Sequence, residues 1–489
     1  MSAEIKNLSP QPVWGYFYDL TQIPRPTGHM EAVTRFMVAF GKGLGLETLQ
    51  DEVGNVLIRK PASPGMEGHK TVTMQSHLDM VPQKNSSVKH DFLTDPIDAY
   101  IDGDWVKARE TTLGADNGMG AAFAMAVLAD KTLTHGPLEA LFTINEEVGM
   151  DGAVGLKPGF LKGEILLNCD SEEEGELFVG CAGGADLNVS MQFKEDTYIP
   201  EGDVAVKISL TGLKGGHSGG DIHLGRGNAN KILNRFLSRM AGRHDLYLCE
   251  INGGNLRNAI PREAYAICAV PEDAKHDVRT ELNIFTSEME DELSVVEPDL
   301  KLVLESEAPR KIAIDQDTTT RLLKALYAAP HGVYAMSQDI PGLVETSTNL
   351  ASVKMKPNHI IRIETSQRSS ILSARNDMAN TVRAVFQLAG ANVTFGEGYP
   401  GWKPNPHSAI LEVAVESYKR LFGVDAKVKA IHAGLECGLF LDKYPTLDMI
   451  SFGPTLTGVH SPDERMLIPT VEKFWKHLLD ILAHVPAKK

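Results

Sequence analysis

A histidine and an aspartate two residues apart, His77 and Asp79, end an apolar, β-branched run that begins at Thr71. Such a run is typical of a buried strand. Alternate residues of an extended segment point to the same side, so the two side chains can leave the strand end together. One imidazole nitrogen can then bind a metal ion while the other donates to the carboxylate, which fixes the ring. A local hydrogen-bonded pair is the ordinary explanation of this triplet, and the triplet alone does not exclude it.

Acidic side chains follow two further apolar runs. Glu146 and Glu147 come directly after the run 138–145, and Asp170 comes after the run 164–168. Adjacent carboxylates at the end of a buried strand are costly unless each holds a cation or a proton. We therefore expect one glutamate to bind a metal ion and the other to hold a proton, with a solvated loop pair as the alternative.

A fourth group, Asp116, precedes the Ala- and Met-rich helix that we predict within 111–130. An N-cap is the alternative role for an aspartate in that place. Ligand sites of open α/β sheets form at the carboxyl ends of the strands. It is improbable that three such strand ends and one helix start all carry metal-binding groups by chance. Together they predict a metal site. His460, in a loop after a short strand at 447–451, is a further candidate ligand.

The rest of the chain predicts the elements that position these groups. Two amphipathic helices within 12–46, a strand pair near 51–59 and the buried strand from Thr71 indicate an α/β domain with a central sheet. From about residue 186, strands and helices alternate in a new pattern, without a visible sequence repeat. We predict a second α/β domain inserted in the first. The predicted boundaries are 1–186 and 398–489 for the catalytic domain and 187–397 for the insertion.

Composition limits the possible partners and compartments. The chain has 489 residues, of which 43% are hydrophobic and 23% charged, as in a globular protein of two ordinary domains. A formal net charge of -16 argues against nucleic acid or an anionic membrane surface as partner. No secretory signal or run of about 20 apolar residues is visible, so we expect a cytoplasmic protein. Scattered cysteines without paired spacing fit a reducing compartment: Cys169, Cys181, Cys249, Cys268 and Cys437.

Several motifs, in order and spacing, resemble the co-catalytic dizinc peptidase family that includes carnosinases, tripeptidase T and carboxypeptidase G-type enzymes. They are SHLDMV, LGADNGMG, NEEVG, CDSE, GGHSGGDI and GVHSPDE. The segments GGNLRNAIPRE, TSQRSS and HAGLECG extend the likeness to dipeptidases of this family over essentially the whole chain. The resemblance implies a zinc-peptidase catalytic domain with a central, mostly parallel sheet, interrupted by an inserted α/β lid and dimerisation domain.

The resemblance also implies a role for each candidate in the metal site. His77 and Asp170 would bind one Zn²⁺, Glu147 and His460 the other, and Asp116 would bridge the two. Imidazole and carboxylate ligands suit zinc, and Co²⁺ and Mn²⁺ tolerate the same set. Asp79 would orient His77, and Glu146 would be the general base that takes a proton from water.

Four further residues are implied to bind substrate. His217 matches a lid histidine that reaches an active site across a dimer interface and stabilises the oxyanion. Asn258 and Arg368 match positions that hold the free carboxylate of the substrate. Glu436 is a candidate for the substrate ammonium group, with a structural role as the alternative. Clamping both ends of a short peptide would select dipeptides.

We therefore predict a metallodipeptidase of broad specificity that also cleaves Xaa-His dipeptides, with a homodimer formed through the lid domain. One alternative is an N-acyl amino acid deacylase of the same family. Some relatives have glutamate where this chain has Asp170, and the aspartate resembles the dipeptidases. The other alternative is an inactive binding protein of this fold. The presence of all five predicted ligands and of Glu146 argues against it.

Overall fold

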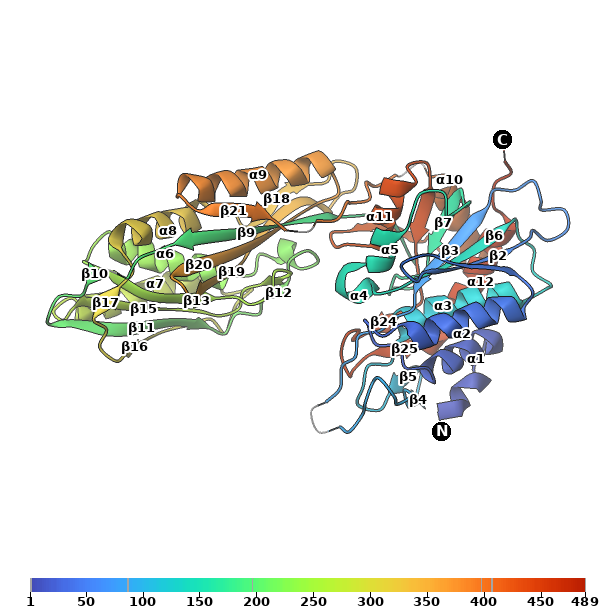
Figure 1. Ribbon diagram of the computed structural model, residues 1–489, viewed down its shortest axis with the longest axis horizontal. Helices are drawn as coiled ribbons and strands as arrows, with labels where there is room; N and C mark the ends of the chain where they lie inside the picture. The colour runs from blue at the N-terminus through green and yellow to red at the C-terminus, as the bar shows by residue number, and fades with distance from the viewer. Residues whose placement is uncertain (1, 86–87, 196, 397, 406–407, 489) are drawn as a thin grey trace. The chain divides into compact units, whose positions relative to one another are not determined.

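A computed structural model describes residues 2–85, 88–195, 197–396, 398–405 and 408–488. The chain forms two compact units (Figure 1). Unit 1 comprises Met1–Cys181, Trp402–Ala430 and Leu435–Lys489, and unit 2 comprises Ala182–Gly401 and Ile431–Gly434. No helix among the described residues is both long and apolar enough to cross a membrane.

Unit 1 is built on an eight-stranded sheet whose central strands are parallel. In spatial order its strands are β1 (Glu47–Gln50), β2 (Val56–Lys60), β6 (Leu138–Thr143), β3 (Val72–His77), β7 (Ile165–Asn168), β23 (Asp448–Ser451), β8 (Glu176–Cys181) and β22 (Lys427–Ile431). The strands β6, β3 and β7 are buried at every position. Both faces of the parallel centre must therefore be covered, as is usual for such sheets. This confirms the predicted fold of the catalytic domain.

Eight α-helices accompany this sheet within the described part of unit 1. They are α1 (Gln11–Thr21), α2 (Glu31–Gly43), α3 (Ala115–Ala129), α4 (Glu146–Gly149), α5 (Asp151–Gly155), α10 (Ala409–Phe422), α11 (Glu436–Lys443) and α12 (Ile468–Ala483). Figure 1 shows α1, α2 and α3 together on one side of the sheet. The helix α3 is buried along almost its whole length and packs on β3, because its small Ala and Gly residues allow close approach. The short 3-10 helix η1 (Ser2–Asn7) packs beside α1.

The register of the parallel strands brings the predicted site residues to one edge of the sheet. His77 ends β3 and lies opposite Thr143, the last residue of β6. Asn168 ends β7 and lies opposite Gln75 of β3. Glu146 and Asp170 follow these strand ends within three residues. A small sheet completes the unit, with β24 (Leu456–Thr457), β25 (Arg465–Leu467), β5 (Trp105–Ala108) and β4 (Ala99–Asp102) in that order.

Unit 2 contains a nine-stranded antiparallel sheet. Its main path is β16 (Lys301–Ser306), β11 (Asp203–Thr211), β15 (Ala264–Pro271), β13 (Tyr247–Gly253), β19 (Val344–Lys356), β20 (Ile360–Ser369), β9 (Gly183–Gln192) and β21 (Asn392–Phe395), and β18 (Gly332–Met336) pairs with β19. Apolar residues of four helices and of one sheet face form a single core. The helices are α6 (Ala229–Ala241), α7 (Lys275–Leu293), α8 (Gln316–Ala328) and α9 (Leu372–Leu388). The helices therefore cover one face of the sheet.

Apart from β18, the large sheet of unit 2 consists of two halves with the same topology. One half runs β11, α6, β13, β15, α7, β16, and the other runs β9, α8, β19, β20, α9, β21. The strand orders are β16-β11-β15-β13 and β21-β9-β20-β19, and the halves join where β13 pairs with β19. The first half is inserted in the second, between β9 and α8. Two small pairs complete the unit, β10 (Thr197–Tyr198) with β17 (Ile312–Ala313) and β12 (Gly216–His217) with β14 (Ala259–Ile260), together with the 3-10 helix η2 (Ile222–Leu224).

The limits of unit 2 differ slightly from the domain limits that we predicted. Unit 2 begins at Ala182 and takes in the returning segment Ile431–Gly434. That segment is attached because the Ala182 amide donates to the carbonyls of Ile431 and Ala433. Residue 397, at the other predicted limit, lies outside the described residues. The domain limits stay a prediction.

Candidate metal centre

His77 is the most deeply buried of the predicted ligands. Its side chain is 1% exposed. The Nδ1 atom lies 3.1 Å from the carbonyl oxygen of Asp79 and 3.4 Å from its carboxylate. The Nε2 atom lies 3.1 Å from Asp116 Oδ1 and 3.3 Å from Asp170 Oδ1. Asp79 therefore fixes the ring, and Nε2 points between two carboxylates.

Asp116 faces two histidines with its two oxygens. Oδ1 lies 3.1 Å from His77 Nε2, and Oδ2 lies 3.3 Å from His460 Nε2. Asp116 stands in the first turn of α3, but its φ and ψ of -80° and 109° are not helical. The N-cap of α3 is Gly114, and the Asp116 carboxylate contacts the two histidines instead. A carboxylate between two imidazoles has the geometry of a bridging metal ligand.

Glu147 and His460 complete the second part of the cluster. His460 Nε2 lies 2.9 Å from Glu147 Oε2. The His460 side chain is 52% exposed and its φ is 60°, so it reaches the cluster from a loop in the left-handed conformation. Possible ligand atoms lie within 4.8 Å of one another in three sets: His77, Asp116 and Asp170; Asp116, Glu147 and His460; and His77, Glu146 and Glu147. The structure thus brings together all five predicted ligands and Glu146.

The carboxylates of this cluster are crowded and poorly solvated. Burial raises the pKa of Asp170 to about 6 and raises that of Glu146 well above its usual range, because ionised carboxylates are poorly solvated here. Hydrogen bonds to Asp116 and Glu147 raise the pKa of His460 to about 11. Among the described residues, Glu147 Oε1 is buried without a hydrogen-bond partner, and Asp170 Oδ1 has only its 3.3 Å contact with His77 Nε2. Carboxylate oxygens of this kind, together with imidazole nitrogens, are the ligand atoms that a divalent metal ion needs.

Two buried residues hold the ligand-bearing loops, and the sequence analysis assigned neither a role. The Glu464 carboxylate accepts four backbone N–H groups from residues 113–116, at 2.8 to 3.2 Å. Arg25 donates to the carbonyls of Leu78 and Gly114 at 2.9 and 2.5 Å. Arg25 therefore joins the loop after His77 to the loop before Asp116. Glu464 joins the latter to the segment that carries His460.

We expect Glu464→Gln to weaken metal binding by about 10- to 100-fold, the usual effect of losing a group that orients ligands. The amide nitrogen of glutamine cannot accept a hydrogen bond, so at least two of the four N–H groups would lose their acceptor. Competition with a chromogenic chelator measures the affinity. Glu472→Gln is a matched control, because the Glu472 side chain is 45% exposed and pairs with Lys476 on α12. Equal affinities of the two variants would show that Glu464 does not position the ligands.

Asp79 and Glu436 lie beneath the cluster. The Asp79 carboxylate accepts the amide N–H groups of Glu146 and Glu147 at 3.0 and 3.3 Å, so it positions both glutamates. Glu436 is fully buried at the start of α11, where Oε2 accepts from Gln75 at 2.6 Å and Thr143 at 2.9 Å. Burial raises the pKa of its carboxyl to about 8. These contacts anchor Glu436 in unit 1.

The other predicted substrate residues belong to unit 2. His217 Nδ1 accepts the amide N–H groups of Gly219 and Gly220 at 3.3 and 2.9 Å, and burial lowers the pKa of His217 to about 4. The neutral ring must therefore carry its proton on Nε2. Arg368 is 7% exposed and donates to the Tyr399 hydroxyl at 2.8 Å. Asn258 is exposed, and its carbonyl accepts from the Ser218 amide at 2.8 Å.

One residue of this group was not predicted from the sequence. His432, in the returning segment, is 6% exposed, and its Nε2 lies 2.7 Å from the Ser347 hydroxyl. Gly219 marks how tightly the segment packs, because a Cβ there would lie 2.1 Å from the His432 carbonyl oxygen and 3.2 Å from Arg368 Cδ. His432 lies in the HAGLECG motif, but nothing in the spacing of the sequence indicates that His432 packs against the loop of His217.

Comparison with known proteins tests the predicted family. Residues 73–484 match the model of peptidase family M20/M25/M40. The chain belongs to this family. The predicted resemblance is thereby confirmed, and so is the prediction of an enzyme that hydrolyses peptide bonds. The family is metal-dependent, in agreement with the donor set of the cluster.

Two members of the M20/M25/M40 family are similar to this chain over its whole length. The cytosol non-specific dipeptidase of Escherichia coli K12 is 47% identical over 486 residues, which cover 99% of this chain and 100% of that protein. The crystal structure of aminoacylhistidine dipeptidase from Vibrio alginolyticus superposes with a TM-score of 0.91 at 45% identity, with full coverage of both chains. Aminopeptidase PepT from Bacillus cereus shares the fold, with a TM-score of 0.61 at 16% identity and coverage of 98% and 99%.

Proposed function

We propose that this chain is a metallodipeptidase that hydrolyses the peptide bond of unblocked dipeptides, Xaa-His dipeptides included. The observation that carries the proposal is the position of Asp116, whose two oxygens face His77 and His460 and so link two groups of ligands. The two full-length relatives are named as dipeptidases, one of them for aminoacyl-histidine substrates. A deacylase could have the same donor set, but its substrate has no free ammonium group. A substrate with a blocked N-terminus therefore distinguishes a deacylase from a dipeptidase.

The metal ions would be held by residues of unit 1 alone. His77 and Asp170 would bind one ion, Glu147 and His460 the other, and Asp116 both. Two Zn²⁺ ions suit this set, and Co²⁺ or Mn²⁺ can replace them. When bound, such ions polarise the scissile carbonyl and acidify a water molecule.

Glu146 would act as general base. It lies in the same cluster as His77 and Glu147 but is not among the proposed ligands, so its carboxylate is free to accept a proton. The Glu146 carboxylate takes the proton from the attacking water and delivers it to the nitrogen of the leaving amine. Bound cations favour the ionised form of Glu146 against the effect of burial. Asp79 supports this step, because it holds the Glu146 backbone and the His77 ring.

Residues of unit 2 would bind the substrate. The Nε2–H of neutral His217 can donate to the developing oxyanion. Arg368 and Asn258 would hold the free carboxylate, and Glu436 in unit 1 would face the ammonium group.

We further propose a cytoplasmic homodimer in which 187–397 forms the lid and the dimer contact. Mixing inactive His217→Ala and Glu146→Ala subunits should restore activity if His217 serves the partner's site. Unrestored activity would place His217 in its own subunit's site.

A substrate panel tests the dipeptidase proposal. Chelated protein is assayed with Ala-His, β-Ala-His, a glycyl dipeptide, a tripeptide and N-acetyl-His, before and after Zn²⁺ or Co²⁺ is added. We expect metal-dependent cleavage of the free dipeptides alone, because both charged ends are needed for binding. Cleavage of N-acetyl-His would identify a deacylase. No cleavage with metal bound would identify a binding protein.

A further inference from the structure

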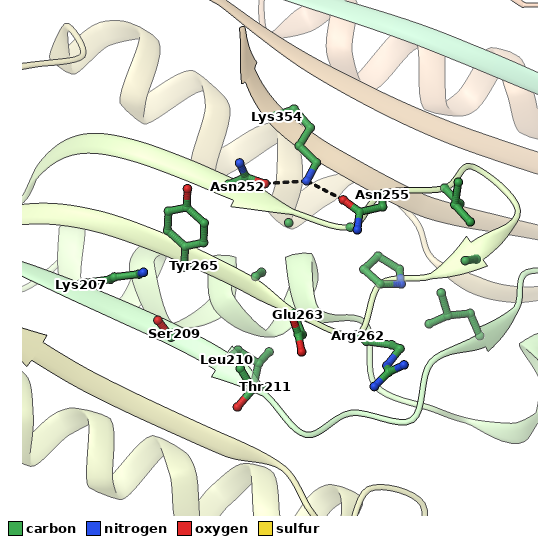
Figure 2. A pocket seen from close by; sticks show the side chains of 17 residues that line it. Lys207, Ser209, Leu210, Thr211, Asn252, Asn255, Arg262, Glu263, Tyr265 and Lys354 are labelled. Carbon is green, nitrogen blue, oxygen red and sulfur yellow. Dashed lines mark hydrogen bonds between the residues drawn. The ribbon is translucent and has the colours of Figure 1, made fainter. Parts of the chain in front are cut away.

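The face of the unit 2 sheet that the helices leave uncovered contains a cavity of about 560 Å³ (Figure 2). Side chains of β11, β15, β13 and β19 and the loop after β13 line it. Its volume lies in the usual range for small-molecule sites. None of the predicted metal, catalytic or substrate residues lines this cavity. Two lining residues, Ala259 and Ile260, nevertheless pair with His217 and Gly216, so the cavity adjoins the loop of His217.

The strand register places the polar lining in one row. Ser209 of β11 pairs with Tyr265 of β15, which pairs with Asn252 of β13, which pairs with Lys354 of β19. Directly paired residues point to the same face of a sheet. Neighbouring strands are about 4.8 Å apart, so the row is about 14 Å wide. Lys207, two residues before Ser209, points to the same face.

The lysines of the cavity are held in place without being neutralised. Lys354 Nζ donates to the side-chain oxygens of Asn252 and Asn255 at 2.7 and 2.9 Å (Figure 2). Lys207 Nζ lies 4.7 Å from the centre of the Tyr265 ring. Amide oxygens and an aromatic face orient an ammonium group but carry no negative charge to compensate it. Both cations are thus preorganised for an anion.

A third cation, Arg262, lies at the cavity and donates through Nε to the Leu213 carbonyl at 3.3 Å. Lys207, Arg262 and Lys354 form no ion pair with a carboxylate of the described residues. Glu263 is the one acidic residue among those lining the cavity. Two further carboxylates lie next to the row: Glu250 accepts from the Tyr265 hydroxyl at 2.6 Å, and Glu305 of β16 pairs with Lys207 in the strand register. The cations therefore exceed the carboxylates only among the lining residues themselves.

We propose that this cavity binds a small phosphate anion that carries at least two negative charges. Lysine ammonium groups bind phosphate as point charges, and the guanidinium of Arg262 at the same cavity can also bind phosphate oxygens. The hydroxyl of Ser209 and the amide of Asn252 supply neutral hydrogen-bonding groups between the charges. Inorganic phosphates and nucleotides share this chemistry.

Isothermal titration of the metal-loaded enzyme with pyrophosphate and with ADP tests the proposal. We expect Lys354→Met and Lys207→Met each to weaken binding at least about tenfold, because each removes a charge-assisted contact. Lys324→Met is the matched control. Lys324 is an exposed lysine of α8, a helix that packs on the other face of the sheet, and its loss should leave binding unchanged. Phosphate bound at the metal cluster would be the same in all four proteins and cannot produce this difference.

The two ligands distinguish the source of the phosphate. Tighter binding of ADP would identify a nucleotide, and equal binding would identify the phosphate groups alone. Wild-type affinity in both cavity variants, or no binding to the wild type, would overturn the proposal. Succinate binding as tightly as pyrophosphate would overturn the choice of phosphate over carboxylate.

Discussion

Glu146→Gln should lower kcat by about 10²- to 10⁴-fold, the range over which a general base contributes to an enzymatic rate. Glutamine has nearly the same shape as glutamate but cannot take a proton from water. The amide N–H of residue 146 would still donate to Asp79, so the backbone that positions Glu147 is retained. We therefore expect the metal content to equal that of the wild type. Steady-state kinetics with Ala-His and metal analysis of the same sample measure both quantities.

Two controls separate loss of the base from loss of the fold. Glu52→Gln removes an exposed glutamate that pairs with Lys157, and an exposed ion pair of this kind contributes little, so kcat should stay unchanged. The metal-free Glu146→Gln protein should melt no lower than the metal-free wild type. The reason is that burial opposes ionisation of the Glu146 carboxylate, and the substitution removes that carboxylate. A near-normal kcat in Glu146→Gln would show that another group accepts the proton.

The sequence predicted the ligand-bearing edge of unit 1 because its signals are local. An apolar run that stops at a histidine or a carboxylate marks a strand end, and parallel strands present such ends at one edge of a sheet. His77, Glu147 and Asp170 could therefore be assigned to one place before their distances were known. His460 could not be assigned in this way, since an exposed loop residue carries no periodic signal. Its place in the prediction came from the family motif.

The groups that hold the ligands could not be predicted from the residues. Glu464 acts by accepting backbone N–H groups about 350 positions earlier in the chain, and a backbone N–H has no sequence signature. Arg25 likewise binds carbonyl groups. The two halves of unit 2 share topology without a visible sequence repeat. The order in which strands pair depends on tertiary contacts, and many different sequences with alternating apolar residues can form the same strands.

The carboxylate of Asp116 is shared between the two ion sites that we propose. Asp116 belongs to both ligand sets, whereas His460 belongs to one. We expect Asp116→Ala to bind almost no metal and to lose dipeptidase activity entirely, because neither ion would keep its three protein ligands. His460→Ala should retain about half of the wild-type metal, since His77, Asp116 and Asp170 remain. Metal analysis after gel filtration in metal-free buffer gives the ratio.

The contrast between these two variants tests the bridge itself. Asp151→Ala, on the exposed start of α5, is the matched control for loss of a carboxylate near the site and should keep the full metal content. Thermal melting of each metal-free protein shows whether the fold is retained, because metal bound to the native state would otherwise mask a difference in stability. Equal metal contents in Asp116→Ala and His460→Ala would contradict a bridging carboxylate. The two oxygens of Asp116 would then serve one ion, and the contact with His460 would be only a hydrogen bond.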